Sequence, residues 1–142
     1  MQSVHSPQAP LAIGPYAQAI RSGNLLFCSG QTPLHPESMT LQGTTIEEQT
    51  QRVLQNLELV LEAAGVNRKS IVKTTVFLKN FADFERMNAV YAAFFGEHRP
   101  ARSTVEVSRL PKDALVEIEC VAQDLGGDRQ RIEILRRTRQ EQ

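Results

Sequence analysis

Two segments of alternating residues near the end of the chain constrain the fold most strongly. In residues 102–107 valines alternate with an arginine, a threonine and a glutamate, and in residues 116–120 apolar side chains alternate with two glutamates. This period of two predicts two strands, each with one apolar and one charged face. Residues 109–114 between them include Pro111 and are too few for a crossover helix, so we expect an antiparallel pair with its charged faces side by side.

Arg102 and Glu117 are the chemical candidates on this expected surface. A guanidinium offers a planar fork of donors that matches a carboxylate, and an acidic side chain opposite it can position or deprotonate water. These two groups would form half of a site for a small carboxylic acid. From the residues alone, a solvated sheet surface with no chemistry remains the alternative.

Composition and charge describe one globular domain with no global preference for polyanions. The 142 residues are 41% hydrophobic and 23% charged, and 16 basic residues balance 16 acidic ones. We therefore expect no membrane partner, and the charge balance argues against a nucleic-acid partner. The N-terminus lacks a basic start followed by an apolar run, which predicts a cytoplasmic location. Cys28 and Cys120 lie in expected strands without CxxC spacing, which favours buried thiols over a metal site or a disulfide.

The first third of the chain predicts a short lead, a hairpin and a loop. Residues 1–13 have no clear period, and Tyr16, Gln18 and Ile20 alternate with small residues as in an edge strand. Residues 21–24 are typical of a turn, and residues 25–31 form an apolar strand that ends in Ser29 and Gly30. A hydroxyl beside a residue without a side chain lets a ligand approach the backbone, although Gly30 would equally suit a bulge.

The middle of the chain predicts two amphipathic helices around a third strand. Threonines at 44 and 45 precede a helix that ends at Gly65, residues 70–79 alternate as a strand, and a second apolar stripe runs from residue 84 to Gly96. Asn88 lies beside that stripe and needs partners if it is buried. The elements together predict an α+β domain in which a mostly antiparallel sheet carries two helices on one face.

The opposite sheet face has no cover in this arrangement. We expect polar, charged and aromatic side chains on it, which suits an interface between subunits with pockets in it. The residues assigned to this face are Ser29, Thr75, Phe77, Arg102, Thr104 and Glu117.

The domain is expected to span residues 1–125, and residues 126–142 are an arginine-rich C-terminal extension. The extension has five arginines and three acids. Ile132, Ile134 and Leu135 could attach a short helix to a neighbouring surface, and a basic tail that touches RNA is the less favoured alternative.

Several motifs, in order and at suitable separations, resemble the RidA family, also called the YjgF/YER057c/UK114 family, over roughly residues 7–125. The motifs are Ile13-Gly14-Pro15-Tyr16, Phe27-Cys28-Ser29-Gly30-Gln31, Glu62-Ala63-Ala64-Gly65, Ile71-Val72-Lys73-Thr74-Thr75-Val76-Phe77, Met87-Asn88-Ala89-Val90-Tyr91, Pro100-Ala101-Arg102-Ser103-Thr104-Val105-Glu106-Val107, and Leu110-Pro111-Lys112 through Glu117-Ile118-Glu119.

The resemblance implies a chorismate-mutase-like fold and a homotrimer with a central barrel and intersubunit sites. It also implies an enamine/imine deaminase, a 2-iminobutanoate/2-iminopropanoate deaminase that removes reactive metabolites. Such a hydrolase converts 2-aminoacrylate-type enamines, or their 2-imino acid tautomers, released by pyridoxal-phosphate enzymes into 2-keto acids and ammonia. No metal or organic cofactor is expected.

The resemblance also implies roles for individual residues. Arg102 matches the arginine that grips the substrate carboxylate, and Glu117 matches the acid near the attacking water. The positions that match cleft or supporting residues are Tyr16, Ser29, Gly30 and Asn88. Thr104 departs from the cysteine of many bacterial members, so we expect it to contribute backbone and volume to substrate binding rather than a nucleophile.

Three alternatives remain open at this point. The same cleft could serve a non-catalytic regulator that binds keto or amino acids. Family members are also described as endoribonucleases or translation inhibitors, against which the zero net charge argues. Relatives that act on aminomuconate or other enamines are a closer alternative, because the sequence does not fix the substrate side chain.

Overall fold

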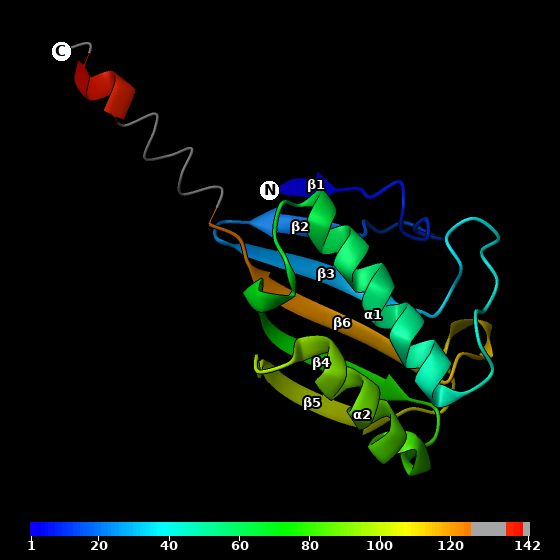
Figure 1. The fold of residues 1–142 in the computed structure, drawn as a ribbon. Coiled ribbons are helices and arrows are strands. Elements are labelled where there is room, and N and C mark those ends of the chain that lie inside the picture. The colour runs from blue at the N-terminus through cyan, green and yellow to red at the C-terminus, as the bar shows by residue number, and fades with distance from the viewer. Residues whose placement is uncertain (126–135, 141–142) are drawn as a thin grey trace.

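The protein is described by a computed structural model that covers residues 1–125 and 136–140. It forms a six-stranded sheet in the order β1-β2-β3-β6-β4-β5, with the two long helices on one face (Figure 1). The elements are β1 (Gln2–Val4), β2 (Ala19–Ser22), β3 (Leu25–Gln31), α1 (Ile46–Ala63), β4 (Ile71–Leu78), α2 (Phe84–Phe95), β5 (Ala101–Glu106) and β6 (Val116–Gln123), with single 3₁₀ turns at Arg68–Ser70, Phe81–Asp83 and Pro111–Asp113. The expected α+β architecture is confirmed.

Both helices begin and end as their sequence signals predict. Thr45 is the N-cap of α1 and accepts a hydrogen bond from the backbone N–H of Glu48. Gly65 follows α1 at a positive φ of 80°, and Gly96 ends α2 at a φ of 62°. The apolar stripes of both helices pack on the sheet in a single core. None of the described helices is long and apolar enough to cross a membrane.

The predicted pairing of residues 102–107 with residues 116–120 is wrong. β5 lies at the edge of the sheet and pairs in parallel with β4, whereas β6 pairs antiparallel with β4 from the other side. The physical reason is the crossover through α2, which returns the chain to the same end of the sheet and favours a parallel neighbour for β4. β4 therefore separates the two strands whose charged faces were expected to adjoin.

The expected positions of Arg102 and Thr104 on the uncovered face are also wrong. They are in register with Thr74 and Val76, which are fully buried beneath the helices. Glu117 is in register with Phe77 and lies on the opposite face. At an edge strand a long polar side chain can lie on the helix side and still reach water, so the charged face of β5 need not turn outward.

The N-terminal segment differs from the expectation in two ways. Residues 2–4 form the additional edge strand β1, paired antiparallel with β2. Tyr16 precedes β2 rather than lying in a strand, and Gln18 is buried instead of alternating outward. β2 contains only four residues, so a pattern of alternation has little length in which to appear. The apolar residues of the extension, Ile132, Ile134 and Leu135, lie outside the described residues.

The sheet face away from the helices carries exposed apolar side chains. Phe27 is 47% exposed and Val105 is 42% exposed. These residues are in register with Val121 and Phe77, whose side chains are partly buried. An uncovered apolar sheet face of this kind is typical of a surface that another protein covers.

Candidate functional site

A hollow of about 620 Å³ lies where the uncovered sheet face meets the loop before β2. It contains four of the predicted site residues. Its lining residues are Pro10, Leu11, Ala12, Ile13, Tyr16, Gln18, Ser29, Gly30, Gln31, Thr32, Leu34, Phe77, Pro111, Lys112, Glu117 and Glu119. We call this hollow the Glu117 half-site.

Glu117 is the ionisable group in the Glu117 half-site whose pKa is clearly shifted. Burial raises the pKa of its half-buried carboxyl above the usual value for a glutamate, and the nearby negative charge of Glu119 raises it further. A carboxyl that faces a hollow and has a raised pKa is suited to accept and return a proton.

Gly30 makes room for this carboxyl. A Cβ atom added at Gly30 would lie 2.9 Å from Cδ of Glu117, closer than real Cβ contacts. The strand pairing of β3 with β6 is irregular between Cys28 and Gln31, at the same place. The irregular pairing supports the expectation that Gly30 suits a bulge, and the missing side chain leaves space for the Glu117 carboxyl. The approach of a ligand to this backbone stays a prediction.

We predict that Gly30→Ala lowers activity more than it lowers stability. The methyl group would displace the Glu117 carboxyl, whereas its surroundings on one side are open to the hollow. Gly23→Ala is the matched control. At Gly23 a methyl group meets open space but the φ is 58°, so this variant should lose about 1 kcal/mol of stability and keep its activity. Thermal unfolding and a turnover assay on both variants test the contrast, and equal activity in the two would contradict it.

Gln18 fixes the loop that forms the wall of the hollow. Its buried amide donates to the carbonyls of Pro10 (2.9 Å) and Ser6 (3.2 Å), and its Oε1 accepts from the Ser6 N–H at 2.6 Å. Ser29 Oγ donates to the carbonyl of Ala17 at 2.7 Å. Sequence reasoning missed the role of Gln18, because its partners Ser6 and Pro10 meet it only in the folded chain.

Tyr16 lies at the rim of the Glu117 half-site. Its side chain is 52% exposed, and its hydroxyl oxygen accepts a hydrogen bond from the Ile13 N–H at 3.1 Å. The ring is therefore not a core aromatic, and its hydroxyl can still donate to a ligand.

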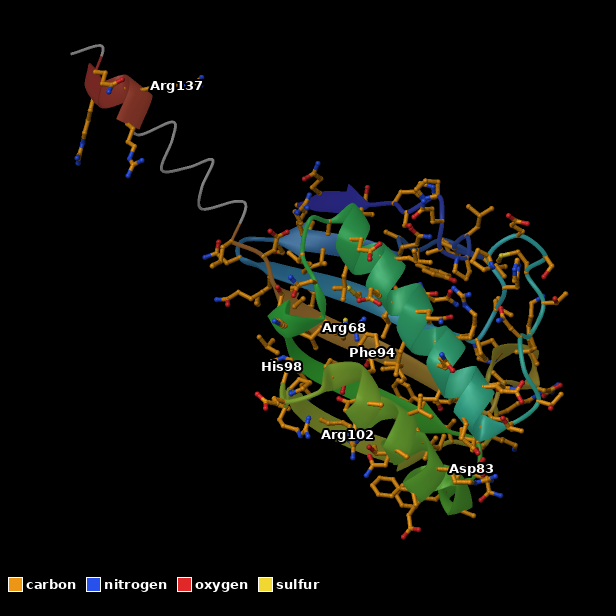
Figure 2. The ribbon with its side chains drawn as sticks, viewed as in Figure 1. Arg68, Asp83, Phe94, His98, Arg102 and Arg137 are labelled. Atoms are coloured by element: carbon orange, nitrogen blue, oxygen red, sulfur yellow. The ribbon has the colours of Figure 1, made fainter. Side chains whose placement is uncertain are left out.

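Arg102 forms a second group, between β5 and α2, which we call the Arg102 half-site. Its Nη1 donates to Asn88 Oδ1 at 2.6 Å, and its guanidinium carbon lies 4.7 Å from the ring centre of Tyr91. Phe84 is a further ring at 5.6 Å. Figure 2 shows Arg102 at the edge of the sheet beside α2. The guanidinium is thus oriented by an amide and two aromatic faces, as a binding group requires.

A hydrogen bond to β4 fixes the hydroxyl of Tyr91. Its hydroxyl shares a 2.7 Å hydrogen bond with Thr74 Oγ1, and burial raises its pKa above the usual value for a tyrosine. The ring therefore stays neutral and fixed under Arg102. Sequence reasoning treated Tyr91 as core, which its 7% exposure supports, and missed that its ring also faces the guanidinium.

Thr104 lies on the same face of β5 as Arg102. Its Oγ1 is buried and makes no hydrogen bond with any residue in 1–125 or 136–140. An unpaired buried hydroxyl costs about 1–3 kcal/mol. The side chain therefore has hydrogen-bonding capacity that the isolated chain does not use.

The predicted site residues fall into two groups on opposite faces of the sheet. Tyr16, Ser29, Gly30 and Glu117 line one hollow. Arg102 and Thr104 on β5, with Asn88 on α2, lie on the helix side. The structure does not bring Arg102 to Glu117 within one chain. Among the described residues, no cluster of three or more His, Cys, Asp or Glu side chains is arranged to hold a metal ion.

Comparison with known proteins identifies the family. The chain matches the endoribonuclease L-PSP family over residues 6–124. It is 50% identical over 119 residues to a RutC family protein of Pyrococcus horikoshii, covering 84% of this chain and 94% of that protein. It is 45% identical over 119 residues to Reactive Intermediate Deaminase A, chloroplastic, of Arabidopsis thaliana, covering 84% of this chain and 64% of the relative.

A solved structure agrees with this assignment. The crystal structure of E. coli TdcF with bound serine has a TM-score of 0.83 and 39% sequence identity, and the match covers 87% of this chain and 98% of that one. The chain therefore belongs to the endoribonuclease L-PSP family, and the predicted resemblance to the RidA family is confirmed.

Proposed function

We propose that the protein is a deaminase that hydrolyses small 2-imino acids, or their enamine tautomers, to 2-keto acids and ammonia. The relative named Reactive Intermediate Deaminase A, at 45% identity, supports a deaminase-type role. Two observations support the proposal. The guanidinium of Arg102 is held by Asn88 and forms no ion pair among the described residues, and burial raises the pKa of the Glu117 carboxyl. These are the two groups that a carboxylate-bearing imine needs.

We further propose that two copies of the chain complete each site. Arg102 and Glu117 lie on opposite faces of one sheet, so the Arg102 half-site of one copy would face the Glu117 half-site of the next. β5 is an edge strand, so its side chains are available to a neighbour, and the uncovered face has exposed apolar residues to bury. A homotrimer with its uncovered sheet faces turned inward is the assembly that we propose.

The chemistry requires positioning and one proton acceptor. Arg102 binds the substrate carboxylate and thereby fixes the imine carbon. Glu117 accepts a proton from water as the oxygen adds to the carbon of the protonated C=N bond, which gives a neutral carbinolamine. It returns that proton to the nitrogen, and the C–N bond then breaks to release ammonia while the remaining O–H proton passes to Glu117 or solvent and the C=O bond forms. Positioned acid–base help of this kind contributes about 10²- to 10⁴-fold. The serine bound to TdcF is a small amino acid with a carboxylate, which is the ligand class this geometry suits.

An amino-acid-oxidase-coupled assay tests the proposed function. An oxidase generates the imino acid in place, and the rate of keto-acid release with the protein is compared with the buffer blank. We expect a clear acceleration that increases with protein concentration. Release no faster than the blank, with keto or amino acids still binding, would instead establish a non-catalytic binding protein.

A further inference from the structure

The Arg102 half-site contains a second guanidinium, that of Arg99. The two arginines line one hollow of about 410 Å³. Its other lining residues are Asn88, Tyr91, Ala92 and Pro100, so none of its lining residues among those described is acidic. One carboxylate needs only one of these two cations.

Neither cation is neutralised by the described part of the chain. The arginines of the domain that form ion pairs with carboxylates are Arg21, Arg68, Arg86 and Arg109. Within residues 1–125 and 136–140, no carboxylate oxygen lies within 4.0 Å of a guanidinium nitrogen of Arg99 or Arg102. Two like charges that share one hollow repel each other, and a ligand with two negative charges relieves that repulsion.

Arg99 is held in place by its own turn. Its Nη1 donates to the carbonyls of Gly96 and His98, at the C-terminal end of α2. A cation is favourable there, because the last carbonyls of a helix point toward it. The hydrogen bonds that the structure gives Arg99 use Nη1 alone, which keeps the rest of the fork available to a ligand.

We propose that the preferred substrate is a 2-imino dicarboxylic acid. This inference rests on the proposed function. Arg102 binds the carboxylate next to the imine carbon, and Arg99 binds the carboxylate at the far end of the side chain. Their backbone positions are three residues apart, and both side chains line one hollow. A four- or five-carbon diacid has the length to bridge them.

The imino acids made from glutamate and glutamine are a matched pair for the test. They have the same length and shape, and differ only in a terminal carboxylate or amide. Each is generated by its amino acid oxidase, and its hydrolysis is measured with the full-length protein. We expect the wild-type chain to prefer the glutamate-derived imine by about tenfold or more in kcat/KM.

The Arg99→Gln variant assigns this preference to one side chain. We expect kcat/KM to fall about tenfold or more for the glutamate-derived imine and less than about twofold for the glutamine-derived imine. Arg109→Gln is the control, because Arg109 is exposed and pairs with Asp113 outside the hollow. An equal preference in the wild type, or an equal fall for both substrates in Arg99→Gln, would overturn the inference.

A binding measurement separates this inference from the proposed function. Calorimetric titration compares 2-oxoglutarate with 2-oxopentanoate, a monocarboxylate of the same chain length. We expect the dicarboxylate to bind about tenfold or more tightly in the wild type, and this difference to disappear in Arg99→Gln. If neither imine is turned over but the binding preference holds, the proposed function fails while the assignment of Arg99 to the second carboxylate of a ligand stands. If the binding preference is absent, the inference fails.

Discussion

Arg102→Ala is expected to lower kcat/KM by about a hundredfold or more. Hydrogen bonds to a charged group contribute about 1.5–3 kcal/mol each, and a guanidinium can make two to one carboxylate. Arg102→Lys should recover little, because it keeps the charge but loses the planar fork that Asn88 and Tyr91 orient. The measurement is the oxidase-coupled assay over a range of substrate concentrations.

Arg109→Ala is the control for this prediction. Arg109 is an exposed arginine, paired with Asp113, and its loss should leave kcat/KM unchanged. Thermal unfolding of all three variants shows whether each remains folded. A folded Arg102→Ala variant that retains wild-type kcat/KM would exclude Arg102 as the carboxylate-binding group.

Glu117→Gln is expected to remove most activity and, at neutral pH, to increase stability. The amide keeps the shape of the carboxyl but cannot accept the proton, so we expect kcat to fall by about 10²- to 10⁴-fold. The stability gain follows from linkage. The folded-state pKa of Glu117 is raised, so the folded protein holds this proton more tightly than the unfolded chain does.

The sign of this effect defines a pH window. The pKa of Glu117 is higher in the folded protein than in the unfolded chain. The free energy of unfolding therefore decreases as pH rises from the unfolded-state pKa to the folded-state pKa. Glu117→Gln removes this loss. Its advantage in thermal unfolding should be full above the folded pKa and should vanish below the usual pKa of a glutamate. A variant that is less stable than wild type at neutral pH would contradict the burial argument.

The same carboxyl should set the acidic limb of the rate profile. As a proton acceptor Glu117 must be ionised, so kcat/KM should fall as pH decreases through its raised pKa. Glu119→Gln removes the neighbouring negative charge and should move this limb to lower pH. A limb that does not move in Glu119→Gln would show that another group controls the rate.

The elements whose signals are local could be predicted from the sequence. Thr45 and Gly65 bracket α1, and the alternation of residues 71–78 fits β4, because capping and burial on one face leave a pattern within each segment. The fold class followed from the order of those segments. Nothing local determines which strand lies beside β4, since that depends on the path of the chain through α2.

For the candidate site too, the sequence predicts single residues but not which of them meet in the folded chain. The sequence predicts Arg102 and Glu117 as site residues, but the common surface expected for them assumed that an apolar face always turns toward the core. At the edge strand β5 that assumption fails, because the apolar side chain of Val105 is 42% exposed. The hydrogen bond to Asn88 and the contact with Tyr91 explain where Arg102 lies instead. Side chains from α2 and β5 meet only in the folded chain.

Mixing two inactive variants tests most directly whether two copies complete each site. Arg102→Ala and Glu117→Gln are each purified, unfolded together in equal amounts and refolded, so that their chains assemble at random. If each site takes Arg102 from one copy and Glu117 from the next, about a quarter of the interfaces regain both groups, and activity should return to about a quarter of the wild-type value. Activity that stays at the level of the separate variants, in assemblies shown to contain both chains, would contradict the account.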